Sequence, residues 1–296
     1  MQVVSATSVL IPSDTCDLGT LQGSAPQHPS YSLLLCTDAD SIEAAQRLRH
    51  EVFTSEPGFA LSTVAAADDG PSEGLDADRF DEYCEHLLVR DDHTGELVGC
   101  YRMLSPPSAI AAGDLYTATE FDISALEPLR PSLVEMGRAV VREGHRNGAV
   151  VLLMWAGILA YLDRRGYDFV AGCVSVPVLD PAGQAAAGSQ LRGVRDFVKR
   201  RHPAPVEYTV FPLRPVVVDG CGLDDISPPG RVSVPSLMRG YLRLGAQVCG
   251  EPAHDPDFGV GDFPALLDKR RADTRYLRRL RTAGAAAVST NETASR

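Results

Sequence analysis

The sequence predicts an α/β (α+β) fold in which a central mixed β-sheet is flanked by helices on both faces. Segments of strand length and segments with helical spacing follow in the order strand, helix, hairpin, strand, helix, strand, helix, strand. Such a mixed order is typical of one sheet that packs helices on both faces. The chain has 296 residues, of which 44% are hydrophobic, and this is enough for one large domain.

The first two elements are a strand and a helix. Tyr31–Cys36 is a short apolar run of strand length. Asp38 stands at the start of the helix that follows, in which apolar residues recur at helical spacing as far as Phe53. Residues 55–77 are rich in Gly, Ala, Asp, Ser and Pro, a composition that predicts a mobile loop.

A hairpin and a further strand come next. Glu85–Arg90 and Leu97–Leu104 are apolar runs on either side of a turn that contains Gly95, and this pattern predicts a β-hairpin. Ser132–Val141 is another apolar run, and we expect it to form a strand.

The second half of the chain is expected to contain more helix. Residues 149–165 predict a long apolar helix, which the buried strand Phe169–Val174 follows. Gly188–Arg201 is an amphipathic helix, and residues 207–218 are an extended stretch. Apolar residues within 236–248 share one helical face, so the domain should end in a helical C-terminal extension.

The organisation of the chain is that of one domain with two tails. Residues 1–28 lack periodicity and are expected to be a flexible leader, and residues 283–296 a disordered tail. Between them, residues 29–282 contain no internal repeat and no long linker.

Composition excludes several classes of protein. The net charge is −11, which disfavours nucleic acid as a partner because phosphate contacts need a basic surface. The seven cysteines contain no Cys-x-x-Cys pair, which argues against a disulfide framework or a zinc ribbon and favours a reducing compartment. The first residues do not resemble a signal peptide, and the longest apolar run, Ala149–Leu162, is shorter than the roughly 20 residues that span a bilayer. We therefore expect a cytoplasmic protein.

A carboxylate lies within the apolar strand at Ser132–Val141. Burial of Glu135 there is costly unless the group is paired or hydrogen-bonded, so one interpretation is a structural pair with an arginine. The other is a general base that removes a proton from an attacking amine, since burial raises the pKa of a carboxyl group. Gly137 lies on the same strand face and would let a ligand approach the backbone closely. The residues alone leave both interpretations open.

The turn at residues 142–149 leads directly from this strand into the long helix. Free backbone N–H groups and the positive end of a helix dipole attract phosphate, and Arg142 and Arg146 add positive charge. A helix start that merely needs a turn explains the same pattern equally well.

Several stretches, in this order along the chain, resemble the acyltransferases of the GNAT fold. They are Arg47–Phe53, Asp78–Leu87, Val98–Leu104, Glu135-x-Gly137-Arg138, Arg146-Asn147-Gly148 and Leu237–Ala246. The chain looks closer still to the bacterial hemolysin-like and ornithine-lipid-forming N-acyltransferases, which are distantly similar to acyl-homoserine-lactone synthases. The resemblance extends from about Ser32 to Leu280.

The resemblance implies a reaction. A long-chain acyl group, with or without a 3-hydroxyl, would move from the thioester of acyl carrier protein or coenzyme A to the amino group of an amino acid, with ornithine as the first candidate. The thioester would be a co-substrate, and no permanently bound cofactor is expected. The product would be a lyso-lipid for ornithine lipid synthesis.

The resemblance also implies roles for individual residues. Glu135 would accept the amine proton, with Gly137 and Arg138 as catalytic neighbours, and the strand edge at 137–140 would pair with the pantetheine amides. The phosphate of phosphopantetheine would be bound by Arg142, Arg146, Gly148 and Ala149. The turn departs from the usual Gln/Arg-x-x-Gly-x-Gly/Ala pattern of this superfamily, which argues against acetyl-coenzyme A as the donor.

The acceptor would be bound, by the same resemblance, by Arg49, Phe53, Asp78, Asp81 and Arg102. Asp78 and Asp81 would bind the ammonium groups of a basic amino acid, or they would fix the neighbouring loop by pairing with arginines. Arg138 or Arg102 would bind a substrate carboxylate through two hydrogen bonds, or would form an internal salt bridge.

The end of the domain is basic although the protein is acidic. Residues 269–281 contain seven Lys and Arg, and such a run is either a solvated face or a surface for acidic carrier protein or anionic membrane lipid. The second alternative adds peripheral contact with the inner face of the membrane. The seven histidines lack metal-ligand spacing, so no metal site is expected.

Two other functions remain open. An acyl-homoserine-lactone synthase-like enzyme would use S-adenosylmethionine, but the extra stretch at about residues 205–280 argues against it. A non-catalytic scaffold would bind carrier protein or membrane through the basic C-terminal region. Replacing Glu135 with Gln separates these classes, because only an enzyme would lose turnover.

Overall fold

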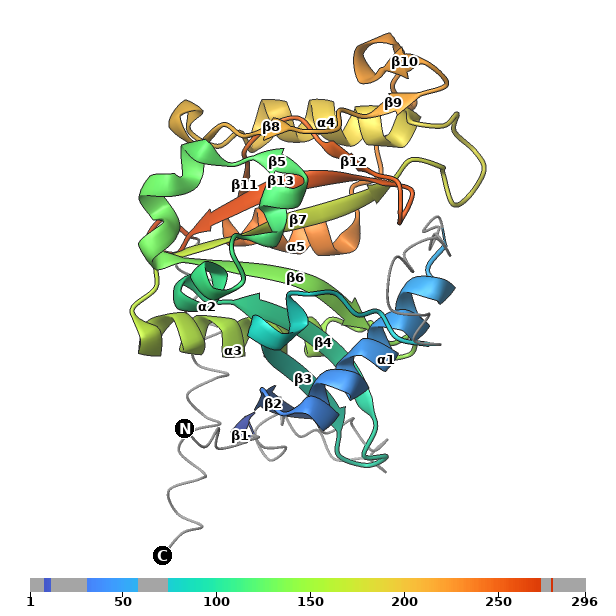
Figure 1. The fold of residues 1–296 in the computed structure, drawn as a ribbon. Coiled ribbons are helices and arrows are strands. Elements are labelled where there is room, and N and C mark those ends of the chain that lie inside the picture. The colour runs from blue at the N-terminus through green and yellow to red at the C-terminus, as the bar shows by residue number, and fades with distance from the viewer. Residues whose placement is uncertain (1–7, 12–30, 58–73, 273–277, 279–296) are drawn as a thin grey trace, which may run out of the picture.

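The computed structural model describes residues 8–11, 31–57, 74–272 and 278, and a nine-stranded sheet forms its centre (Figure 1). The strand order is β1-β2-β3-β4-β6-β7-β13-β11, with β12 beside β13. Among the described strands of this sheet, β6 and β7 are the one pair that runs parallel. The strands of this sheet are β1 Ser8–Ile11, β2 Tyr31–Cys36, β3 Glu85–Asp91, β4 Leu97–Leu104, β6 Leu133–Val141, β7 Phe169–Pro177, β11 Gln247–Val248, β12 Ala253–Asp255 and β13 Val260–Asp268.

Helices cover both faces of the sheet (Figure 1). They are α1 Ala39–Ser55, α2 Pro106–Ala111, α3 Ala149–Arg165, α4 Ser189–Arg201 and α5 Ser236–Leu244. Short 3-10 segments are η2 Asp81–Tyr83, η3 Tyr116–Thr119, η4 Ser124–Ser132, η5 Val206–Tyr208 and η6 Leu223–Asp225. Two small sheets pair β5 Phe121–Asp122 with β8 Phe211–Pro212, and β9 Val217–Val218 with β10 Cys221–Gly222.

Alternation along the strands assigns each side chain to one face. On β6, Val134 and Met136 pack with α3, α4 and α5 in the largest apolar cluster. Leu133 packs with α2, η3 and η4 on the opposite face, and Val140 packs there with α1. We call these the α3 face and the α1 face of the sheet. Because side chains alternate, Glu135 points to the α1 face.

The sheet opens between β6 and β7. The two strands pair only at Leu133–Glu135 and Phe169–Ala171, after which β6 pairs with β4 alone and β7 with β13 alone. Gly172 lies at the parting point, which we call the fork. A Cβ atom on Gly172 would lie 2.2 Å from the carbonyl oxygen of Met136, so only glycine allows this close approach of the two backbones.

Gly172→Ala is therefore expected to lower the free energy of unfolding by about 1 to 3 kcal/mol, the usual cost of overpacking, or by more if β6 and β7 separate. Chemical denaturation measures this loss. Gly137→Ala is the matched control, because a Cβ atom on Gly137 meets nothing within 4 Å. Equal stability of the two variants would contradict the proposed close contact at the fork.

A β-bulge lies just beyond the fork. Cys100 pairs with Val140 and Arg102 with Gly137, so that two residues of β6 stand opposite one residue of β4. Arg138 is in the bulge and has a φ of 51°, in the left-handed region that a non-glycine residue rarely adopts. A bulge leaves its extra residue out of the ladder and redirects the side chain.

The fold class expected from the sequence is confirmed, with its central mixed sheet and its helices on both faces. The expected helices at 149–165 and 188–201 and the hairpin at 85–104 are present. The C-terminal part also supplies β11, β12 and β13, which the sequence analysis did not predict. Within the expected leader, Ser8–Ile11 form a strand that pairs with β2.

Some expectations lie outside the described residues. These are the remainder of the leader, most of the loop at 55–77, most of the basic stretch at 269–281 and the tail at 283–296. Among the helices that the structure describes, none combines the length and the apolar character needed to cross a bilayer.

Candidate active site

A cleft of about 730 Å³ is lined at the fork by both diverging strands. Residues 135–141 of β6 line it together with residues 173–175 and Pro177 of β7. The volume is within the range of sites that bind small molecules. The cleft therefore lies where the sheet lacks a strand.

The two sides of the cleft differ in chemistry. On the α3 face its lining is mostly apolar or aromatic, with Leu152, Met154, Leu237 and Tyr241, and Arg243 of α5 adds a charged side chain. On the α1 face the lining contains most of the charged side chains, and it includes Phe53, Arg102, Tyr116, Glu135, Arg138, Asp255, Phe258 and Asp262. A molecule with an aliphatic part and a charged part can satisfy both sides.

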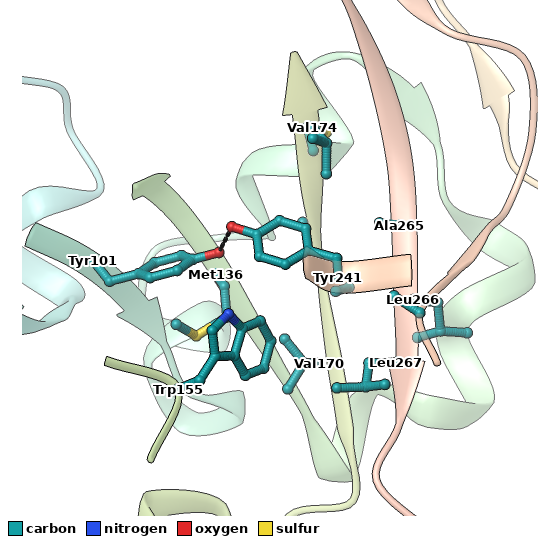
Figure 2. A pocket seen from close by; sticks show the side chains of 13 residues that line it. Tyr101, Met136, Trp155, Val170, Val174, Tyr241, Ala265, Leu266 and Leu267 are labelled. Atoms are coloured by element: carbon teal, nitrogen blue, oxygen red, sulfur yellow. Dashed lines mark hydrogen bonds between the residues drawn. The ribbon is translucent and has the colours of Figure 1, made fainter. Parts of the chain in front are cut away.

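A small apolar cavity of about 30 Å³ adjoins the α3-face side (Figure 2). Tyr101, Met136 and Tyr241 line both this cavity and the cleft, and Trp155 lines the cavity. The hydroxyl groups of Tyr101 and Tyr241 are hydrogen-bonded to each other, as Figure 2 shows. The apolar side of the cleft thus continues toward the core.

Glu135 lies at the apex of the cleft and is only 5% exposed. Its Oε2 accepts a hydrogen bond from the backbone N–H of Tyr116 at 2.5 Å, and its Oε1 accepts one from the N–H of Thr117 at 2.7 Å. The hydroxyl of Thr117 donates a third. Burial raises the pKa of Glu135 although these donors favour the ionised form. A carboxylate has about four acceptor positions, so three donors leave one available.

The four charged residues among the predicted acceptor residues belong to an ion network that is largely buried. The Arg49 side chain has no exposed surface, and its guanidinium contacts Asp81 at 2.7 Å and Asp76 at 2.8 Å. Arg102 contacts Asp78 at 2.6 Å and Asp81 at 2.9 Å. Despite their burial, the adjacent arginines hold the pKa values of Asp78 and Asp81 below the ordinary range.

Arg138 completes this network, which then contains three arginines and three aspartates. Its guanidinium contacts Asp76 at 3.3 Å and Asp78 at 3.2 Å. It also lies 5.2 Å from the ring centroids of both Tyr116 and Phe258, in cation–π contact with each. The network therefore fixes the loop at 76–81 and orients Arg138 beside the cleft.

A second acidic group lies farther along the α1 face. The carboxylates of Glu120, Asp255 and Asp262, which we call the carboxylate triad, each offer an oxygen within 4.8 Å of the others. All three residues are buried, and Asp255 and Asp262 line the cleft. Burial, together with the neighbouring negative charges, raises the pKa values of Glu120 and Asp262.

Sequence analysis missed the carboxylate triad. Its first and last members, Glu120 and Asp262, are 142 residues apart in the sequence. The three residues come from the segment after η3, from β12 and from β13. Asp262 was the one available signal, because the other residues of 260–267 are apolar or glycine. Pro264 in the same run weakens the pattern of a central strand.

The predicted phosphate site is a turn at the start of α3. Gly148 caps the helix with a φ of 92°, and Ala149 N–H donates to Asn147 Oδ1 at 3.0 Å. Arg146 contacts Glu56 at 2.6 Å and lines the cleft, as Gly148 does. Arg142 contacts Glu51 at 2.8 Å and is not part of the cleft lining.

The structure thus divides the predicted site residues into two groups. Those that line the cleft are Phe53, Arg102, Glu135, Gly137, Arg138, Arg146 and Gly148. Those that lie outside its lining are Arg49, Asp78, Asp81, Arg142 and Ala149. Of the basic C-terminal run, Lys269 contacts Asp163 at 3.0 Å and Arg270 contacts Asp268 at 3.0 Å, so its first residues are engaged in pairs.

Comparison with known proteins agrees with this architecture. Residues 48–156 match the family model described as an acetyltransferase (GNAT) domain. The L-ornithine N(alpha)-acyltransferase of Brucella abortus (strain 2308) is 34% identical over 260 residues, covering 84% of this chain and 88% of that protein. The enzyme of the same name from Rhizobium meliloti (strain 1021) is 33% identical, covering 82% of this chain and 81% of that protein.

The solved structures that are similar to this chain include one of a coenzyme A-dependent acyl-homoserine lactone synthase, BjaI, with MTA. It is 16% identical to this chain with a TM-score of 0.45, and the match covers 83% of each chain.

An open sheet of this topology with a matching GNAT domain defines an acyltransferase of the GNAT class. Within that class, the chain belongs to the L-ornithine N(alpha)-acyltransferase family. It is therefore an N-acyltransferase.

Proposed function

We propose that this enzyme transfers a long-chain acyl group from a phosphopantetheine thioester to the α-amino group of ornithine. The single observation that best supports the proposal is the cleft at the fork, which is mostly apolar on the α3 face and carries most of its charged side chains on the α1 face. An acyl chain suits the first side and an amino acid suits the second. The names of the relatives support ornithine as the acceptor. The product would be a lyso-lipid intermediate of an ornithine lipid.

The chemistry is one nucleophilic substitution at a carbonyl carbon. The neutral amine attacks the thioester carbon, the C–N bond forms, and the C–S bond breaks as the thiol leaves with a proton. The amine gives up a proton, and Glu135 is the proposed acceptor because its carboxylate is at the apex and has a position free. A backbone N–H of the bulge at Arg138 is the proposed donor to the oxyanion.

The donor and the acceptor would enter from opposite faces. The pantetheine arm would lie along residues 137–140 of β6, in the place of the missing strand, with its phosphate near Arg146 and Gly148. On the α1 face, Arg138 would bind the carboxylate of the amino acid. Arg102 is less suited to this role, since its side chain is 5% exposed and is engaged by Asp78 and Asp81.

The test is a product assay with purified protein. Long-chain and 3-hydroxy long-chain thioesters of coenzyme A and of acyl carrier protein are each incubated with ornithine, other amino acids and S-adenosylmethionine, and the products are identified by mass spectrometry. We expect N-acylornithine and no acyl-homoserine lactone. The absence of N-acylornithine with every donor would overturn the proposal.

Arg146→Ala tests the phosphate site. Because Arg146 is 44% exposed, its loss is expected to raise KM for the thioester only about threefold to tenfold, with kcat changed less than twofold. Steady-state kinetics with varied donor measure this. Arg164→Ala, at the other end of α3, is the control and should leave KM unchanged. An unaltered KM in Arg146→Ala would refute the assignment.

A further inference from the structure

The carboxylate triad lacks a cation of its own. None of the ion pairs among the described residues includes Glu120, Asp255 or Asp262. The charge of Arg138 acts on Asp262, but Arg138 is already paired with Asp76 and Asp78 in the ion network. Three buried carboxylates without a paired cation are costly, so a cation that binds there gains a large electrostatic attraction.

The hydrogen-bond partners of the triad also leave room for a ligand. Asp255 Oδ1 accepts from the N–H groups of Asp257 and Phe258 at 2.8 and 3.3 Å, and Asp262 Oδ1 accepts from the hydroxyl of Ser175 at 2.6 Å. Glu120 is only 2% exposed, and the side chains of Tyr116 and Cys173 lie beside it and favour its ionised form, yet its Oε2 has no hydrogen-bond partner of normal geometry among the described residues. Such a buried acceptor is rare unless a ligand or water satisfies it.

The triad is displaced from the apex along β7. Glu135 lies opposite Ala171, whereas Asp262 lies opposite Ser175, four residues farther on the same face. Four residues correspond to about 13 Å along the strand. Cys173 lies midway between Ala171 and Ser175 on the same face, and its thiol pKa is raised by burial and by the charges of Glu120, Asp262 and Glu135. Glu135 and the triad therefore act on one short stretch of the cleft, which suits an acceptor with amino groups at both ends of a short aliphatic chain.

We propose that Glu120, Asp255 and Asp262 form the subsite that binds the side-chain ammonium group of a diamino acid acceptor. This deepens the proposed function and rests on it. The attacking amine is a poor occupant of the subsite, because three carboxylates would keep it protonated and without a lone pair. The side-chain amine remains an ammonium throughout the reaction and donates three hydrogen bonds, one for each carboxylate.

A divalent cation is the competing occupant, because three convergent carboxylates are also a metal-ligand set. The position of Asp255 and Asp262 in the lining of an amino acid cleft favours the ammonium group. The raised pKa values of Glu120 and Asp262 agree with carboxyl groups that have no bound cation until the ammonium group of the acceptor arrives.

The test compares binding of ornithine with binding of norvaline, which has the same carbon chain without the terminal amine. Calorimetric titration of the chelator-treated wild-type protein is expected to give about 10- to 100-fold tighter binding of ornithine, as for hydrogen bonds to charged groups. Glu120→Gln and Asp262→Asn should reduce this preference to less than about threefold and leave norvaline binding within about twofold of wild type.

Both variants are expected to fold, because each removes one of three mutually repelling charges, and Asn can still accept from Ser175. Their melting temperatures should equal or exceed that of the wild type. Asp257→Asn is the matched control, since Asp257 is exposed in the same turn as Asp255 and is outside the triad, and it should keep the full preference.

Three results would overturn the subsite. They are equal binding of ornithine and norvaline by the wild type, an unchanged preference in both variants, and Mn²⁺ binding that Glu120→Gln abolishes while ornithine does not compete.

The product assay separates failure of the subsite from failure of the proposed function. Preferential ornithine binding without N-acylornithine formation would contradict the proposed function and support the subsite. Equal acylation of ornithine and norvaline would contradict the subsite alone.

Discussion

Glu135→Gln is expected to lower kcat about 100-fold or more, the usual range for the loss of a general base. The carboxamide cannot accept the amine proton, and its NH₂ group would replace an oxygen that now faces the N–H of Tyr116 or Thr117. That substitution places a donor against a donor, which costs about 1 to 3 kcal/mol of stability. Steady-state kinetics and thermal denaturation together measure both effects.

The pH dependence separates catalysis from structure. In the wild type, kcat/KM should rise with pH as Glu135 loses its proton, and burial displaces this limb above the ordinary carboxyl range. The limb should disappear in Glu135→Gln. Thr117→Val is a useful companion, because it removes one donor to Glu135 and keeps the carboxylate. A folded Glu135→Gln enzyme with wild-type kcat would rule out Glu135 as the base.

Arg49→Leu is expected to lower the free energy of unfolding by about 3 to 5 kcal/mol, the cost of removing one partner from a buried ion pair. Asp81 and Asp76 would then share the remaining arginines, although their side chains are only 4% and 8% exposed. Arg47→Leu is the control on the same helix, since Arg47 forms an exposed pair with Glu43, and its loss should cost no more than about 0.5 kcal/mol. Chemical denaturation at pH 7 compares the two.

The sign of the pH effect provides a second check. The pKa of Asp81 is lower in the folded protein than in the unfolded chain, so its contribution to stability is present above the unfolded value of about 4 and is lost as the pH falls below it. Without Arg49 this pKa should rise, and the penalty of Arg49→Leu should be smaller at pH 4 than at pH 7. An equal penalty at both pH values would contradict the pairing of Arg49 with Asp81.

Local patterns in the sequence predicted those elements that local physics determines. The helix at Ala39–Ser55 begins at Asp38, whose side chain accepts a hydrogen bond from Ser41 N–H, and its apolar period matches the buried face. The sequence indicates Glu135 as a candidate site residue, because a carboxylate in an apolar strand is costly to bury unless it is paired or hydrogen-bonded. The hydrogen bonds come from Tyr116 and Thr117, and no local pattern connects them with Glu135.

Long-range pairing accounts for what could not be predicted. β13 combines Asp262 and Pro264 with apolar residues, and its place between β7 and β11 depends on contacts with distant segments. The two interpretations of Asp78 and Asp81 likewise differ only in three dimensions, where both residues contact arginines of the ion network. The balance of three arginines against three aspartates depends on the positions of residues that are distant in the sequence, so no local pattern predicts it.

The parting of β6 from β7 bears on how firmly the two halves of the molecule hold together. Three residue pairs join them across the sheet, so much of the cohesion between the halves comes from side chains around an opening. An acyl donor laid into that opening would act as a tenth strand. Bound substrate would then stabilise the folded protein, by an amount that grows with the logarithm of the thioester concentration.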